Sequence, residues 1–142
     1  APAVERLGES PGVVVTGKVE DVRPYLQHAQ ASVAPLKIAR GVQNKVLEAL
    51  SMETPVVATP SAVEGLHPAV GALVDVAESP EAFLAALLQV IAQTSKSSEG
   101  AFRRAIERYY DWDTNLSPIV DEFGRGAELT VEAGMEASAN PR

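Results

Sequence analysis

The chain has 142 residues, which suits one domain, and its 46% hydrophobic content is enough to form a core. Charged residues make up 22% of the sequence, which argues against intrinsic disorder, and the lack of cysteine excludes disulfides and thiolate metal sites. The formal charge of −7, without any basic stripe, disfavours nucleic acid as a partner.

The negative charge is unevenly placed. Residues 1–70 hold six cations and seven acids, whereas residues 71–142 hold six cations and twelve acids. No signal peptide is visible, and no apolar run is long enough to cross a membrane. We therefore expect a soluble, cytoplasmic protein.

Short β-branched runs alternate with helical patterns in the first half of the chain. After a helix tail at Ala1–Leu7, strands are expected at Val13–Thr16, Ala31–Leu36, Val56–Thr59 and Leu73–Ala77. Helices are expected between them, one over Val22–Ala29 after a capping Asp21 and one starting near Asn44, which we take as its N-cap. About 20 residues separate successive strand starts, a spacing that predicts βαβ units and a parallel sheet.

The second half of the chain is helical in pattern. Ser79-Pro80-Glu81 supplies a cap, a proline at the first helical position and an acid in the first turn. The buried stripe of that helix is predicted to be Leu84, Leu87, Leu88 and Ile91. A further helix is lined by Phe102, Ala105, Ile106 and Tyr109, and a last one starts at Asp113. The apolar period fades after Phe123, so we divide the chain into an α/β domain at 1–123 and a loosely held tail at 124–142.

The strongest functional signal lies between Lys37 and Thr59. Lys37, Arg40 and Lys45 surround the start of the predicted helix, and no acid stands between Lys37 and Asn44. Free backbone N–H groups and the positive end of a helix favour an anion, so three neighbouring cations predict a phosphate-bearing ligand. The alternative is an ordinary solvated surface.

Other candidate features are weaker. Asp111-Trp112-Asp113 has the form of a DxD metal motif, but at a helix junction we interpret its acids as caps and expect no metal site. His67 and Glu64 lie in the loop after the valine-rich strand, where exposure is the simpler interpretation. No dinucleotide-type glycine motif or hydrolase triad is visible.

Residues 39–59, ARGVQNKVLEALSMETPVVAT, resemble the donor-binding segment of GT-B glycosyltransferases of family 4, the "group 1" transferases. Glu48 matches the family's ribose-binding Glu, whereas Arg40 replaces a Glu that contacts the donor sugar, and Gln43 replaces a loop glycine. The sugar transferases associated with exosortase/PEP-CTERM exopolysaccharide systems carry ARGVQNKVLEA itself. VTGKVEDVRPYL and YYDWDTNL are similar to the same bacterial group, and the resemblance runs from about Ala1 to Phe123.

The resemblance implies a three-layer, Rossmann-like parallel sheet, incomplete with about four strands and flanked by helices. It also implies retaining transfer of a hexose from a sugar nucleotide to a polysaccharide or lipid-linked acceptor, without an obligatory metal. We assign the phosphates to Arg40 and Lys45, the ribose to Glu48, close backbone approach to Gly41, and donor roles to Gln43 and Asn44. No catalytic residue is assigned in this chain.

By comparison with the family, the N-terminal acceptor domain and the first two donor-domain strands are missing. We therefore expect this polypeptide to be inactive alone, and the full protein to act in the cytoplasm or at the inner membrane surface. Val13–Thr16 is expected either to move in beside Ala31–Leu36 or to remain poorly anchored. We therefore expect a rearranged four-stranded sheet or a dimer that self-associates through the open sheet edge. A different class of function remains open, that of a non-catalytic α/β interaction module whose cationic loop binds a protein acid or nothing.

Glu53 departs from the family in a way that predicts strain. The family has glycine two residues before the proline that matches Pro55, because the helix ends there in a left-handed conformation. A Glu in that conformation costs about 1 kcal/mol relative to glycine. Either this strain is present or the helix ends differently.

Overall fold

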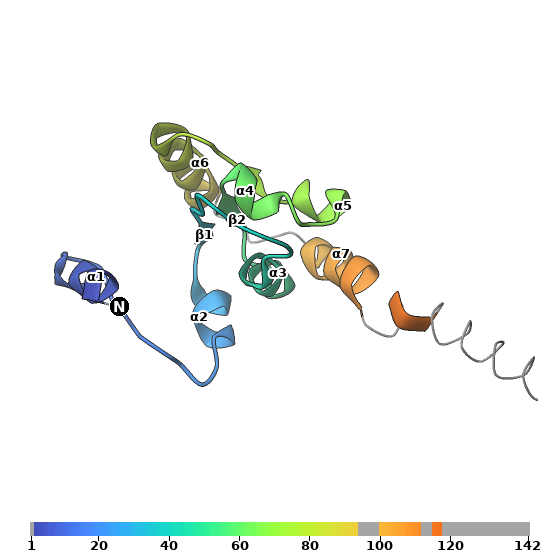
Figure 1. Ribbon diagram of the computed structural model, residues 1–142, viewed down its shortest axis with the longest axis horizontal. Coiled ribbons are helices and arrows are strands. Elements are labelled where there is room, and N and C mark those ends of the chain that lie inside the picture. Colours follow the sequence, from blue (N-terminus) through green and yellow to red (C-terminus); the bar gives the residue numbers. More distant parts are fainter. Residues whose placement is uncertain (1, 94–99, 112–114, 118–142) are drawn as a thin grey trace, which may run out of the picture.

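A parallel three-stranded sheet forms the centre of the molecule (Figure 1). The computed structural model describes residues 2–93, 100–111 and 115–117. The strands are β1 (Ser32–Ala34), β2 (Val56–Ala58) and β3 (Asp75–Val76), in the order β1-β2-β3. In register, Ser32 pairs with Val56 and Val57 pairs with Asp75. The predicted α/β, Rossmann-like parallel fold is confirmed.

Helices precede, connect and follow the strands. They are α1 (Pro2–Glu5), the 3-10 helix η1 (Arg6–Glu9), α2 (Arg23–His28), α3 (Asn44–Ser51), α4 (Pro60–Val63), α5 (Pro68–Gly71), α6 (Pro80–Ala92) and α7 (Ala101–Tyr110). Ser79 caps α6 as predicted, since its hydroxyl accepts the N–H of Ala82 at 3.1 Å. A further helical turn covers 115–117, whereas the predicted helix start at Asp113 and the tail at 124–142 lie outside the described residues.

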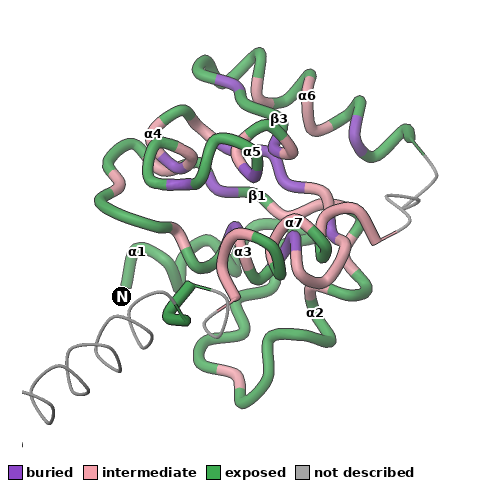
Figure 2. The backbone as a smooth tube through the Cα atoms, turned by 90° about the vertical axis from the view of Figure 1, so that its right-hand side faces the viewer, coloured by how far each residue is buried: buried purple, intermediate pink, exposed green. Residues whose placement is uncertain are grey.

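The helices make two layers around the sheet. α3 packs on β1 and β2, α6 packs on β2 and β3, and α7 packs on α3 and α5. Figure 1 places α3 and α6 on opposite faces. Buried positions gather on β2, on α3 and in the α4–α5 segment (Figure 2). The core consists of Ala34, Val46, Ala49, Leu50, Val56, Ala58, Ala62, Leu66, Val70 and Val74.

The prediction of a strand at Val13–Thr16 is wrong. This segment lies outside the three-stranded sheet, and its residues are exposed, Val14 to 83%. A β-branched run forms a strand only where a neighbouring strand accepts its backbone hydrogen bonds, and no strand of the described residues lies beside Val13–Thr16. The sheet therefore has three strands rather than about four, and Val13–Thr16 has not moved in beside β1. Self-association through the open β1 edge stays a prediction.

The predicted buried stripe of α6 is also wrong in its direction. Leu84 and Leu88 are 57% and 58% exposed and Ile91 is 38% exposed, whereas Val90 is buried and Leu87 is half-buried. The helix is apolar on almost every side, so its periodicity does not single out one face. The sheet is narrow, and α6 packs mainly on two of its strands, which leaves the opposite side of the helix uncovered.

Of the two alternatives that the sequence left open for Glu53, the structure has the strained conformation, with a φ of 56° just after α3. Its Oε1 accepts the backbone N–H of Arg103 at 2.8 Å, in the first turn of α7. The Nε of Arg103 in turn donates to the carbonyl of Ser51 at 3.2 Å, at the end of α3. Gly100, the N-cap of α7, has no side chain to do this. Glu53 thus caps α7 while Arg103 caps α3.

Candidate functional site

The loop between β1 and α3 is held from the segment that follows β2. The Oγ1 of Thr59 donates to the carbonyl of Leu36 at 2.6 Å, and the Oγ of Ser61 donates to the carbonyl of Lys37 at 3.5 Å. Both hydroxyls act on the first residues of the loop, at the carboxyl ends of the strands. This is the edge at which open parallel sheets bind their ligands.

The second part of the loop carries the predicted glycine. Gly41 has a φ of 66°, in the left-handed region that favours glycine. The Nε2 of Gln43 donates to the carbonyls of Arg40 at 3.3 Å and Gly41 at 3.1 Å. The Gln43 amide therefore shapes the loop, because both of these bonds go to carbonyls of the loop itself.

α3 begins without a side-chain cap. The N-cap position belongs to Gln43, with φ −92° and ψ 93°, so the prediction that Asn44 is the cap is wrong by one residue. Asn44 is the first helical residue because Gln43 supplies the extended conformation before it. The N–H of Val46 donates to the carbonyl of Gln43 at 2.9 Å. Within the described residues, the N–H groups of Asn44 and Lys45 have no acceptor, which leaves two donors for an anion.

Three predicted ligand side chains surround this helix start. Arg40, Lys45 and Glu48 are all exposed. In the part of the chain that the structure describes, none of the three side chains has a hydrogen-bond or ion-pair partner. The two cations are therefore not neutralised by a described acid, and they add a positive field to the free end of α3.

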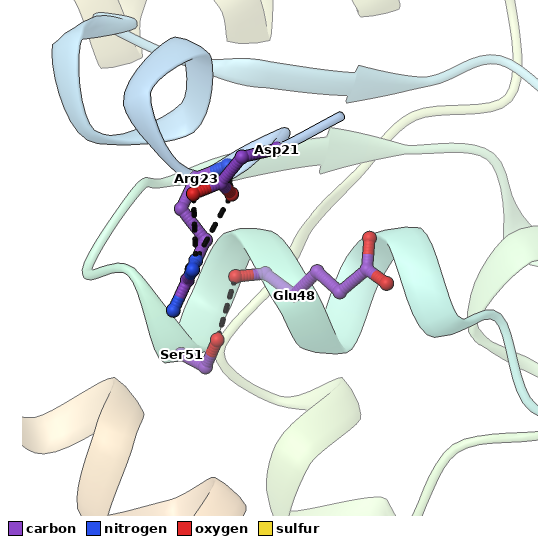
Figure 3. A network of polar contacts seen from close by, with 4 residues as sticks. All are labelled: Asp21, Arg23, Glu48 and Ser51. Atoms are coloured by element: carbon purple, nitrogen blue, oxygen red, sulfur yellow. Dashed lines mark hydrogen bonds and ion pairs between the residues drawn. The ribbon is translucent and has the colours of Figure 1, made fainter. Parts of the chain in front are cut away.

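Glu48 faces a hollow between α3 and the start of α2. The hollow, of about 320 Å³, is lined among others by Glu48, Asp21 and Arg23. Arg23 Nε donates to both oxygens of Asp21, at 2.9 and 3.1 Å, and this bond lowers the pKa of Asp21. Figure 3 shows that the Glu48 carboxylate stays apart from this pair and points along α3. Arg23 is thus already paired, and Glu48 keeps both oxygens as acceptors.

A second and larger hollow lies on the other side of the loop. Its volume is about 430 Å³, and it is lined by residues after each strand and by the first turns of α6. Lys37 follows β1, Thr59 follows β2 and Glu78 follows β3, and the remaining wall is apolar, with Phe83 and Leu87. This hollow lies at the carboxyl ends of the strands, where open α/β sheets form the crevice that binds their ligands.

The weaker candidates from the sequence are His67, Glu64 and the DxD motif, and the described residues give none of them a ligand-binding role. His67 is exposed and caps α5, because its Nδ1 accepts the N–H of Ala69 at 3.2 Å, and its ring stacks on Tyr109 at 3.9 Å. Glu64 is exposed on the surface, and Trp112 lies outside the described residues, so the DxD motif is not seen as a unit.

Sequence reasoning missed the residues that support the loop. They are Thr59 and Ser61, whose hydroxyls donate to loop carbonyls, and Gly65, whose lack of a side chain lets the loop backbone come close. Each contacts a residue more than twenty positions earlier in the chain. The sequence does show a hydroxyl directly after a buried strand, at Thr59. It does not show which carbonyl that hydroxyl bonds, because this depends on how the loop after β1 folds back.

Comparison with known families identifies this arrangement. Residues 1–93 match the family model of the glycosyl transferases, group 1. The chain belongs to this family. The match covers more than half of the group 1 glycosyltransferase chain and includes the whole sheet, the loop and α3, while α7 lies beyond it. No curated protein and no solved structure matches significantly.

Family membership implies sugar transfer from a nucleotide donor. Among the described residues, no helix is long and apolar enough to span a bilayer. The same residues contain no group of three or more His, Asp or Glu side chains placed to hold a metal ion.

Proposed function

We propose that this chain is the donor-binding part of a retaining group 1 glycosyltransferase, and that the diphosphate of a sugar nucleotide binds at the start of α3. One observation carries the proposal. The N–H groups of Asn44 and Lys45 have no acceptor within the described residues, and the side chains of Arg40 and Lys45 beside them have no acidic partner there.

The chemistry of sugar transfer uses such a site. When the bond between the sugar and the diphosphate breaks, negative charge grows on the leaving diphosphate. Backbone donors and cations that already point at this position stabilise the developing charge without further reorganisation. Arg40 stands where most members of the family carry an acid, so we assign it to the phosphates instead of the sugar hydroxyls.

We assign Glu48 to the ribose of the donor. A carboxylate with both oxygens available can accept hydrogen bonds from two neighbouring hydroxyls, and charged acceptors make the stronger bonds. Glu48 lies one turn further along α3 than Lys45, as expected if one nucleotide contacts both residues. Gly41 then allows the loop backbone to approach the ligand.

The finer assignments rest on the resemblance of residues 39–59 to the exosortase-associated transferases. They are a hexose as the transferred group, a polysaccharide or lipid-linked acceptor in bacterial exopolysaccharide synthesis, and no obligatory metal. The proposal places acceptor binding in a separate N-terminal domain of the full protein, which acts in the cytoplasm or at the inner membrane surface. Residues 1–142 alone are then inactive.

Calorimetry on the full protein tests the proposal, with UDP, GDP and ADP as probes. Lys45→Ala should weaken binding of the preferred diphosphate by about 1–2 kcal/mol, the scale of a charged hydrogen bond. Lys18→Ala removes an equally exposed cation from the segment before α2 and should leave the affinity unchanged. Equal affinities for wild type and Lys45→Ala would refute the phosphate site. Failure of all three diphosphates to bind would favour the non-catalytic interaction module.

A further inference from the structure

We propose that Gly65 is a positioning residue for the donor site, because it holds the loop at residues 40–43 in the conformation that the phosphates require. This inference rests on the proposed function of that loop. Gly65 lies after α4, outside the stretch that carries the predicted ligand residues.

The contact is between two backbones. A Cβ added to Gly65 would lie 2.5 Å from the carbonyl carbon of Gly41 and 3.1 Å from the nitrogen of Val42. Both are backbone atoms rather than the movable end of a side chain, so the clash can be removed only if the loop or the backbone around Gly65 shifts. Ordinary contact begins near 3.4 Å, which means a displacement of about 1 Å.

Gly65 is a glycine because a side chain at this position would have no room beside the loop backbone. The positive-φ glycines of the described chain are Gly12, Gly17, Gly41 and Gly100, so Gly65 does not need glycine for its own backbone conformation. Its lack of a side chain serves the close approach of the loop. Gly41, opposite it, needs glycine for its positive φ.

The contact completes a row of three along one segment. Thr59 holds the carbonyl of Leu36, Ser61 holds that of Lys37, and Gly65 meets the backbone of Gly41. The contacts therefore follow the same order along both segments, from Leu36 at the start of the loop to Gly41. The segment acts as a support against which the cationic loop is fixed before a ligand arrives.

Gly65→Ala should therefore move the loop and leave the core in place. The added methyl group meets only the loop backbone among the atoms nearest to it, and Leu66 and Ala62 remain available to the core. Because a backbone donor that shifts by about 1 Å no longer lies at hydrogen-bond distance from the phosphate, and hydrogen bonds to charged groups are the stronger ones, we expect at least about a 10-fold loss of diphosphate affinity.

A matched glycine serves as the control. Gly71 lies at the end of α5, its φ is not positive, and a Cβ added there meets nothing within 4 Å. Both variants are made in the full protein, and their affinities for UDP, GDP and ADP are measured by calorimetry. Hydrogen exchange of the peptide covering residues 37–47 reports the loop without any ligand. We expect Gly65→Ala to weaken diphosphate binding and speed exchange in that peptide, with Gly71→Ala close to wild type in both.

The outcomes separate the two proposals. If wild type binds a diphosphate and Gly65→Ala binds it equally well with unchanged exchange, the positioning role is overturned and the phosphate site stands. If no diphosphate binds wild type, the proposed function fails, and the role of Gly65 at that site fails with it, whatever the exchange shows. If Gly65→Ala and Gly71→Ala lose affinity together, the effect is not specific to the loop contact and the inference is overturned.

Discussion

Replacing Glu53 separates two effects that oppose each other at one residue. The backbone of Glu53 is left-handed, with φ 56°, and its carboxylate caps α7 through the N–H of Arg103. Glu53→Ala keeps the unfavourable backbone conformation and removes the cap. Glu53→Gly removes the cap as well, but it also removes the strain. The two variants should therefore differ in stability although neither has a carboxylate.

The magnitudes follow from the two interactions. A helix cap is worth about 1 kcal/mol, and a non-glycine residue in the left-handed region costs about 1 kcal/mol relative to glycine. Glu53→Ala should lower the free energy of unfolding by about 1 kcal/mol, whereas Glu53→Gly should stay near wild type. In melting temperature, a difference of about 1 kcal/mol corresponds to about 3–5 °C for a domain of this size.

Urea denaturation and thermal melting measure both variants, with Glu64→Ala as a control that removes an exposed carboxylate elsewhere. Equal stability of Glu53→Ala and Glu53→Gly would refute the strain argument. Equal stability of Glu53→Ala and wild type would refute the cap. Glu53→Gln retains an oxygen acceptor and the strain, and should fall between Glu53→Ala and wild type.

Three further changes test other parts of the molecule. Glu48→Gln should reduce kcat/KM of the full enzyme without lowering its melting temperature, because it removes a charged acceptor and keeps the volume; lost stability with intact activity would make Glu48 structural. Thr54→Val should lower the free energy of unfolding in urea by about 1 kcal/mol, since the buried Thr54 hydroxyl donates to the carbonyl of Leu26 at 2.7 Å; a gain would contradict this. His67→Ala should cost about 1 kcal/mol by losing the α5 cap, and His67→Asn should recover part of it; equal melting of the two would exclude the cap.

Local signals predicted the features that depend on near neighbours. The alternation of β-branched runs and helices gave the parallel sheet, and Ser79-Pro80-Glu81 gave the start of α6, because caps and periods act within a few residues. The left-handed conformation of Glu53 is one of two outcomes that the resemblance to the family left open, because the family carries glycine at this position. The predicted start of α3 near Asn44 is confirmed, and only the N-cap is displaced by one residue, to Gln43.

Features that depend on distant partners could not be predicted in this way. Val13–Thr16 has the composition of a strand, but whether it pairs depends on which edge is available beside it. α6 is apolar on several sides, so the narrow sheet decided which face was buried. The contact of Gly65 with the loop joins residues more than twenty positions apart and leaves no trace in either segment alone.

The position of α7 has a consequence for anyone who trims this protein for expression. The family match ends at residue 93, and a fragment cut there would keep every proposed donor residue. It would also lose Phe102, Ile106 and Tyr109, which pack against the core, and the Tyr110 hydroxyl that accepts the N–H of His67 at 2.6 Å. The end of the family match is therefore not the end of the folded unit, and an expressed fragment should include α7.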